Sequence, residues 1–194
     1  MEKTILSVRN LCAGYRNYRI LDGISLDIER GKIYSIIGPN GCGKTTLIRA
    51  MSRNLRPESG EVLLDGKDIF RTNTKLVAQK MAVLCQNDTS MSDITVKTLV
   101  EYGRYAHKKW WAGSDGDDKS IVEWAIVMVL HDMNHAARYS DELVLVNNSK
   151  IHTIGTPNEL IENGELENVF CVEAEILADT EDNSPVFYAK RKKQ

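Results

Sequence analysis

A glycine-rich stretch that holds one lysine is the part of this chain whose residue types are best suited to chemistry. It reads Gly38-Pro39-Asn40-Gly41-Cys42-Gly43-Lys44-Thr45-Thr46. A strand-like apolar run precedes it and a helix-like run follows it, which is the context that a phosphate-binding loop requires. Glycines let successive backbone N–H groups point at phosphate oxygens, and the start of the following helix favours the same negative charge. The stretch therefore predicts a nucleotide site, and the alternative is a glycine-rich turn that binds nothing.

The side chains of this loop have separate expected roles. Lys44 is expected to reach the β- and γ-phosphates of ATP, and the Thr45 hydroxyl is expected to bind the Mg²⁺ that accompanies ATP. ATP and Mg²⁺ are thus the cofactors that the sequence predicts. The expected nucleotide contacts in the loop are Gly38, Asn40, Gly41, Cys42, Gly43, Lys44, Thr45 and Thr46.

Length and composition are those of an ordinary globular chain. The 194 residues fit one domain, with 27% charged and 42% hydrophobic residues. The net charge of -2 gives no electrostatic basis for a nucleic-acid partner. Cys12, Cys42, Cys85 and Cys171 lack the spacing of metal ligands and favour a reducing compartment. The apolar run at 125–130 is far shorter than the roughly 20 residues that cross a bilayer, so we expect a membrane role only through a partner.

Hydrophobic periodicity outlines the elements that must position the loop. Period-two patterns and apolar runs between turn residues predict strands, and spacing of three to four predicts helices. Asp93 is a plausible N-cap for a helix at 95–105, and a polar loop follows at 112–118. Strands are expected at 5–8, 23–28, 33–37, 61–64, 81–85, 127–130, 143–146, 173–177 and 186–189, and further helices at 46–51, 120–125, 131–139 and 158–162.

One junction between these elements is abnormal. The helical pattern that starts at Ser120 runs directly into the strand at 127–130, and no Gly or Pro occurs between Gly116 and Gly155. A helix that enters a central strand normally needs a connection of about two to six residues to reverse direction. No such connection is visible near 125–127.

Taken together, these segments resemble the ATP-binding subunit of an ABC transporter, of the type found in bacterial importers of iron-siderophore, haem or cobalamin. The resemblance implies the α/β fold of P-loop NTPases, with a RecA-like parallel core, an antiparallel β subdomain and a truncated helical subdomain. It divides a single domain, 1–194, into 1–92, a partial helical subdomain at 93–126, and 127–194. The matching motifs are Ala13-Gly14-Tyr15, the phosphate loop, 57–62, Gln86, 99–105, 131–136, Ser140-Asp141 and Gly155-Thr156-Pro157.

The resemblance also implies roles for three residues outside the loop. Tyr15 corresponds to the aromatic residue that stacks on adenine, and the alternative is a half-buried core tyrosine. Gln86 corresponds to the glutamine that contacts Mg²⁺ and water, and the alternative is a polar strand end. His131 corresponds to the histidine that hydrogen-bonds the γ-phosphate, and the alternative is a structural histidine. Gln86 and His131 are therefore the candidate catalytic residues, with Thr45 and Gln86 as candidate metal ligands.

The chain departs from the family where hydrolysis is concerned. The family places a Ser-Gly-Gly signature loop, an Mg²⁺-binding Asp and a catalytic Glu before the histidine strand, and none of them occurs here. The run 62–65 imitates an apolar strand ending in aspartate, but it falls too early and reads as an antiparallel hairpin. Asp132 is the other conceivable substitute ligand. The simplest account is an internal deletion, and hydrolysis is expected to be weak or absent.

Two functions follow as expectations from the resemblance. The first is the ATP-binding subunit that powers uptake of a metal chelate, with permease subunits and a substrate-binding protein as partners, peripheral on the cytoplasmic face of the membrane. The alternative is a non-catalytic, nucleotide-binding remnant of such a subunit. The family's head-to-tail homodimer is not expected, because each signature loop must close on the partner's ATP. Loss of a buried central strand would cost about 7 to 15 kcal/mol, comparable with a domain's whole stability.

Overall fold

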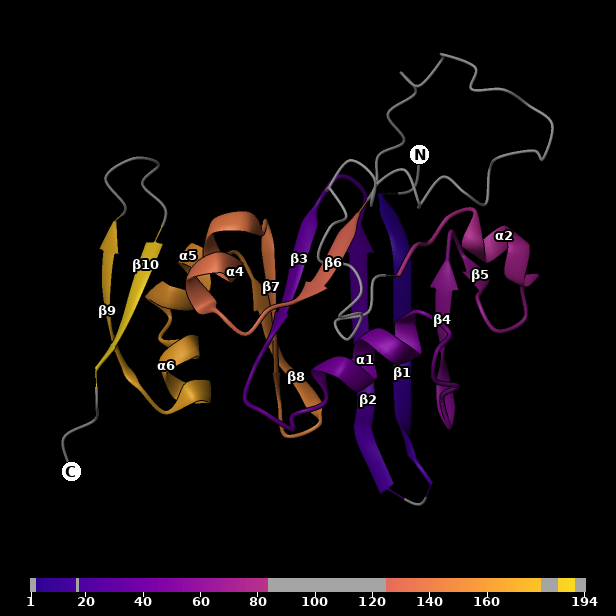
Figure 1. Cartoon of the computed structure of the whole chain (residues 1–194), viewed down its shortest axis with the longest axis horizontal. Coiled ribbons are helices and arrows are strands. Elements are labelled where there is room, and N and C mark those ends of the chain that lie inside the picture. Colours follow the sequence, from indigo (N-terminus) through magenta and orange to yellow (C-terminus); the bar gives the residue numbers. More distant parts are fainter. Residues whose placement is uncertain (1–2, 17, 84–124, 179–184, 191–194) are drawn as a thin grey trace, which may run out of the picture.

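The computed structural model describes residues 3–16, 18–83, 125–178 and 185–190. Within these ranges the strands form two four-stranded sheets and one two-stranded hairpin (Figure 1). The expected Gln86 position, the helices at 95–105 and 120–125 and most of the expected subdomain at 93–126 lie outside the described residues. The α/β class that the sequence predicts is confirmed.

The first sheet is antiparallel, in the order β2-β1-β4-β5. The period-two strands predicted at its start are confirmed and extend further than expected, because they pair along most of their length. In β2, Ile24, Leu26 and Ile28 are buried and the residues between them are exposed. The strands are β1 (Thr4–Tyr15), β2 (Tyr18–Glu29), β4 (Ser59–Leu64) and β5 (Lys67–Asp68).

The apolar run that ends in Asp65 belongs to this antiparallel sheet. Val62 pairs with Val8 of β1, and a turn at Asp65-Gly66 leads into β5, so the predicted hairpin is confirmed. The Asp65 carboxylate forms ion pairs with Arg30 and Lys80. Asp65 is therefore a structural residue of the sheet.

The second sheet carries the phosphate loop, in the order β6-β3-β7-β8. Both β6 and β7 run parallel to β3, as a RecA-like core requires, and β8 returns antiparallel to β7. The sequence did not predict β8, although the two residues of its turn, Asn148 and Ser149, have the positive φ angles typical of a tight hairpin. The strands are β6 (Ile126–Val129), β3 (Ile33–Ile37), β7 (Glu142–Asn147) and β8 (Lys150–Gly155).

Strand β6 borders this sheet. The Ile126 N–H donates to Lys32 O, just before β3, at 3.1 Å, and the Leu130 N–H donates to Ile36 O of β3 at 3.4 Å. Alternate residues of a strand point their N–H groups to opposite sides, so those of Val127 and Val129 face away from β3. The strand expected over 127–130 is confirmed as β6, parallel to β3. In the described part of the chain β6 pairs on one side only, its residues 127–129 are partly buried, and Ile126 is 50% exposed.

Five helices connect and cover the sheets in the described residues. Helix α1 contacts β1 and β2 of one sheet and β6 of the other, so it lies between them (Figure 1). Helices α2 and α6 were not predicted. None of the helices in the described part of the chain has the length and apolar character that a membrane crossing needs. The bounds are α1 (Lys44–Met51), α2 (Thr74–Ala78), α4 (Met133–Tyr139), α5 (Pro157–Glu162) and α6 (Glu165–Phe170).

Residues 81–83 correct one prediction. A strand was expected over 81–85, but the described residues 81–83 are irregular. The Met81 N–H donates to Val77 O of α2 at 2.9 Å. This N–H group is therefore not available for pairing with a neighbouring strand. Met81 packs instead at the edge of the first core.

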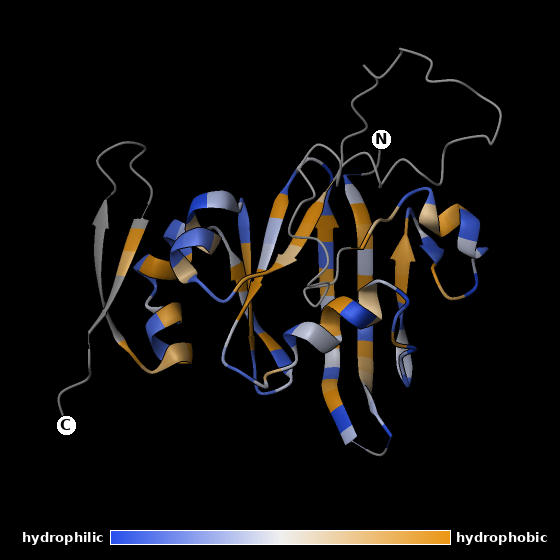
Figure 2. Cartoon of the chain, in the orientation of Figure 1, coloured by the Kyte–Doolittle hydropathy of each residue, from blue (hydrophilic) through white to orange (hydrophobic). Residues whose placement is uncertain are grey.

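Two hydrophobic cores hold the elements together. One joins the antiparallel sheet to α1 and to one face of β3 and β7, and the other joins the opposite face of β3 and β7 to α4, α5 and α6. Figure 2 shows the apolar residues concentrated along the strands of both sheets. The chain ends in a hairpin of β9 (Glu173–Ala178) and β10 (Pro185–Lys190), both expected from the sequence, and β10 contacts α4.

Candidate functional site

The phosphate loop joins β3 to α1 in a conformation that depends on two glycines. Gly38 has φ 150°, and a Cβ there would lie 2.1 Å from the carbonyl oxygen of Val146. Gly43 has φ 111°, and a Cβ there would lie 2.8 Å from Leu21 Cδ2. Any other residue would be strained at both positions and would push the loop away from its neighbours. The sequence therefore folds locally into a tight curve between strand and helix.

Lys44 occupies the centre of this curve. Its Nζ donates to Gly38 O at 2.7 Å and to Pro39 O at 2.8 Å, and only 5% of the residue is exposed. No side chain caps α1, whose N-cap is Gly43, so the first N–H groups of the helix keep their capacity to donate. A buried ammonium group and an uncapped helix start together favour an anion.

A hollow of about 280 Å³ lies at this loop. It brings His131 together with Lys44 and Thr45, although these residues are far apart in the sequence. The reason is topological: β3 and β6 are parallel neighbours, so the segments that follow them leave from the same edge of the sheet. The residues around the hollow are Ile20, Asn40, Gly41, Gly43, Lys44, Thr45, Thr46 and His131.

The other loop residues expected at the nucleotide lie beside the hollow. Gly38 starts the curve, and the Cys42 side chain is buried with its Sγ 4.0 Å from Lys44 Nζ. Their part in the site is to shape the loop.

Tyr15 lies at the end of β1 and is 38% exposed. Its hydroxyl accepts a hydrogen bond from Arg49 of α1 at 2.9 Å, and the guanidinium carbon lies 6.0 Å from the ring centre, within cation–π range. Tyr15 does not line the hollow, so stacking on adenine stays a prediction. Ile20 of β2 does line it, and the sequence did not single out this residue. Ile20 reaches the phosphate loop because of the register between β1 and β2, in which Tyr15 pairs with Tyr18.

Asp132 has a structural role at the start of α4. Its carboxylate accepts a hydrogen bond from the His135 N–H at 3.0 Å and caps the helix. This hydrogen bond to the charged form lowers the pKa of Asp132 below its usual value. Within the described ranges no cluster of three or more His, Cys, Asp or Glu side chains is arranged to hold a metal ion.

Two further motifs of the resemblance position the elements around the site. In the first, the Ser140 hydroxyl donates to Ser35 Oγ at 2.6 Å, and the Asp141 carboxylate accepts from the Ile33 N–H at 2.7 Å. These contacts hold the end of α4 against β3. In the second, Thr156 and Glu159 form a reciprocal capping box that starts α5.

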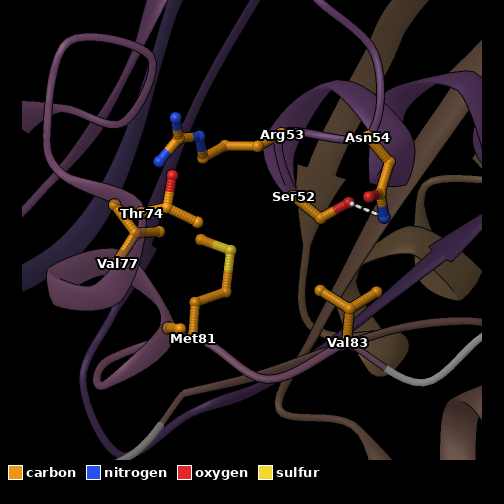
Figure 3. A pocket seen from close by; sticks show the side chains of 8 residues that line it. Ser52, Arg53, Asn54, Thr74, Val77, Met81 and Val83 are labelled. Atoms are coloured by element: carbon orange, nitrogen blue, oxygen red, sulfur yellow. Dashed lines mark hydrogen bonds between the residues drawn. The ribbon is translucent and has the colours of Figure 1, made fainter. Parts of the chain in front are cut away.

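A second hollow, of about 310 Å³, lies at the other end of α1. Figure 3 shows apolar side chains of Val77, Met81 and Val83 facing the polar end of α1, where Asn54 Nδ2 donates to Ser52 Oγ at 3.2 Å. The Arg53 guanidinium donates to Thr72 O at 3.2 Å. No residue of the phosphate loop takes part, so this hollow is separate from the candidate nucleotide site.

The phosphate loop, the parallel core and the helix that follows define a P-loop nucleotide-binding protein. The sequence model of the family described as "ABC transporter" matches residues 21–154, most of the chain. The chain therefore belongs to the ABC transporter family, and nucleotide binding follows from that membership.

Proteins of known sequence and structure agree with this assignment. The chain is 29% identical to the iron(3+)-hydroxamate import ATP-binding protein FhuC of Bacillus subtilis, with 93% of each chain covered. It is 27% identical to the ferric enterobactin transport ATP-binding protein FepC of Escherichia coli, over 91% of this chain and 90% of the other. The fold is similar to that of MJ1267, an ATP-binding cassette of an ABC transporter, with a TM-score of 0.63, 16% identity, and 87% and 99% coverage.

These alignments confirm an internal deletion. The alignment with FhuC extends over 250 positions but includes 93% of the 194 residues here, which is about 180 residues. About 70 positions of that alignment therefore face a gap in this chain, and the FepC alignment, with 245 positions and 91% of the chain, gives a similar gap. In contrast, a 118-position match to the protein MJ0873 of Methanocaldococcus jannaschii includes 61% of this chain, which leaves no such gap.

Proposed function

We propose that this chain is the ATP-binding subunit of an ABC importer for iron-siderophore complexes or related metal chelates. The observation that carries the proposal is the convergence of Lys44, Thr45 and His131 on one hollow at the phosphate loop. The relatives named above, whose names specify hydroxamate and enterobactin iron uptake, support the chelate class.

The residues around the hollow fit the phosphates of a nucleotide. Lys44 would exchange its bonds to Gly38 O and Pro39 O for phosphate oxygens, and the first N–H groups of α1 would donate to the same anion. His131 would donate a hydrogen bond to the terminal phosphate, and Tyr15 would stack on the base.

Magnesium has fewer candidate ligands. Among the described residues, those that line the hollow include the hydroxyl of Thr45 and no carboxylate. Mg²⁺, when bound, neutralises charge on the β- and γ-phosphates. Thr45, the nucleotide's own oxygens and Gln86 would hold it, which is a weaker set than one that includes an aspartate.

The second candidate function, nucleotide binding without fast hydrolysis, is favoured by the same lining. No carboxylate in the described site can orient and deprotonate an attacking water, and such a general base contributes about 10²- to 10⁴-fold to the rate. We infer that this chain binds ATP and turns it over slowly.

Permease subunits would place this chain at the cytoplasmic face of the membrane, and a substrate-binding protein would be the third component. The missing signature loop disfavours a head-to-tail homodimer.

A thermal melt with and without MgATP tests the binding function. A ligand that binds only the folded state stabilises it by about 2.7 kcal/mol at a hundredfold excess over Kd, so the melting temperature should rise. Lys44→Ala should abolish the rise, whereas Lys75→Ala, an exposed lysine of α2, should keep it. Absence of any rise in the unmodified chain would contradict the proposal. A fast hydrolysis rate that depends on Lys44 would contradict the second candidate function.

A further inference from the structure

The side chain of Asn134 holds the backbone of β10 as a neighbouring strand would. Its Oδ1 accepts from the Phe187 N–H at 2.6 Å, and its Nδ2 donates to Phe187 O at 3.4 Å. One amide thus satisfies both backbone groups of a single residue. Buried or half-buried backbone groups need such partners, because leaving them unpaired costs free energy.

The C-terminal hairpin depends on this attachment. Strands β9 and β10 pair with each other, and neither joins a four-stranded sheet. Phe187 is 7% exposed and packs in the second core, which also includes Ile37, the last residue before the phosphate loop, and Ala136 of α4. Among the side chains that the structure describes, Phe187 and the amide of Asn134 therefore attach the hairpin to α4.

The same turn of α4 leads directly to the nucleotide site. The chain passes from β6 through His131 and Asp132 into α4, and Asp132 caps the helix while Asn134 binds the hairpin. The first turn of α4 is thus held from two directions. His131, immediately before the cap, lines the hollow with Lys44. A change in the position of this turn would move His131 relative to the phosphate loop.

We propose that Asn134 is a positioning residue, which uses the docked C-terminal hairpin to hold His131 at the phosphate loop. This inference rests on the proposed function, in which His131 contacts the terminal phosphate of ATP. It assigns the hairpin a role in nucleotide recognition, although none of its described residues lines the hollow.

The ratio of ATP affinity to ADP affinity distinguishes a positioning role of Asn134 from a purely structural role. Only ATP has the terminal phosphate, so a displaced His131 weakens ATP binding and leaves ADP binding nearly unchanged. One hydrogen bond to a charged group is worth about ten- to a hundredfold in affinity. A merely structural Asn134 would change both affinities by the same factor.

The test uses the full chain and four variants: Asn134→Ala, His131→Ala, the double variant, and Asn168→Ala on the exposed surface of α6 as a matched control. Dissociation constants for ATP and ADP are measured by calorimetry. We expect His131→Ala to lower the ATP/ADP affinity ratio by about tenfold or more, and Asn134→Ala, which displaces His131 without removing it, to lower the ratio by at least about threefold. The double variant should lower it no further than His131→Ala alone, and Asn168→Ala should leave it unchanged.

Three results would overturn the inference, and they have different meanings. If His131→Ala lowers the ratio and Asn134→Ala does not, the positioning role is wrong and the role of His131 stands. If both leave the ratio unchanged, the proposed contact of His131 fails as well. If Asn134→Ala weakens ATP and ADP equally, its role is structural. If Asn134→Ala does not unfold cooperatively, Asn134→Gln replaces it in the same test. Asn134→Gln keeps the amide but displaces it by one methylene, so we expect a smaller loss of the ATP/ADP affinity ratio.

Discussion

The ammonium group of Lys44 donates to the carbonyl oxygen of Gly38 at 2.7 Å, so a hydrogen bond joins the lysine to the first residue of the phosphate loop. A charge that is already placed needs little rearrangement when an anion takes over from the two loop carbonyls. The curve of the loop is thus part of the site, and its glycines are open to test.

Gly38→Ala should destabilise the chain more than Gly41→Ala. Both glycines have positive φ angles, 150° and 79°, so both substitutions carry a backbone cost of about 1 kcal/mol or more. A Cβ at Gly38 would also lie 2.1 Å from Val146 O, whereas a Cβ at Gly41 meets nothing within 4 Å. Urea unfolding should show a free energy loss at least about 1 kcal/mol larger for Gly38→Ala. Equal losses would contradict the close approach to β7.

Asp132→Asn should reduce the acid sensitivity of the chain. The folded-state pKa of Asp132 lies below its unfolded value because its carboxylate accepts the His135 N–H. Its charge therefore contributes stability above the unfolded pKa, near 3.9, and the contribution is lost as pH falls through the folded pKa. The exposed site limits the effect to about 0.3 to 1 kcal/mol. Unfolding free energies measured from pH 6 to pH 2.5 should fall less steeply for Asp132→Asn.

The same variant tests whether Asp132 is a magnesium ligand. Asparagine keeps the capping oxygen and removes the charge, so the helix start is preserved. We expect MgATP affinity to be unchanged, because the carboxylate already caps α4. A large loss of Mg²⁺-dependent affinity, with ATP affinity unchanged in the absence of metal, would assign Asp132 to the metal.

Tyr15→Ala should weaken ATP and leave inorganic triphosphate unaffected. Stacking of an aromatic ring is worth about 0.5 to 1.5 kcal/mol, which is about two- to tenfold in Kd, and triphosphate has no base to stack. Tyr18, the cross-strand partner of Tyr15, is 79% exposed and offers the matched control Tyr18→Ala. Competition binding with both ligands measures the effect. Equal weakening of both ligands by Tyr15→Ala would indicate a structural tyrosine.

Ile126→Lys should reduce self-association of the chain. Ile126 is 50% exposed on β6, in an uncharged apolar run that, among the described strands, pairs with β3 alone. Exposed apolar edge strands favour pairing between chains, and a lysine on the edge opposes it. Ile154, 40% exposed on the opposite edge strand β8, provides the control Ile154→Lys. Light scattering against concentration should fall only for Ile126→Lys, and an equal fall for both would implicate general charge.

The local chemistry of the site could be predicted from the sequence. The phosphate loop is recognisable because its glycines, its lysine and its flanking elements are contiguous, and short-range geometry determines how such a segment curls. The period of apolar residues predicted β1, β2, β3, β7 and α1 for the same reason. The sequence also predicted an internal deletion, because family motifs are missing and the expected helix at 120–125 runs into the next strand without a turn. The gap of about 70 positions against the siderophore relatives agrees with a deletion within the chain.

Elements whose signals are weak or shared with others could not be predicted. The strand expected over 81–85 is wrong for 81–83, where the Met81 N–H bonds to Val77 O of α2. Strand β8 was not predicted because its alternation is short and partly polar. The apolar run at β6 reads the same whether a strand is central or at an edge, because composition does not report the number of its neighbours.

Long-range pairing decided the rest. The parallel pairing of β3 and β6 brings His131 to Lys44, and the β1–β2 register brings Ile20 to the same hollow. The bond between Asn134 and Phe187 likewise joins residues far apart in the sequence. The sequence by itself determined the chemistry of the phosphate loop, because that chemistry lies in one contiguous segment. Only the tertiary structure decided what surrounds it, because strand pairing and core packing depend on contacts that no local pattern specifies.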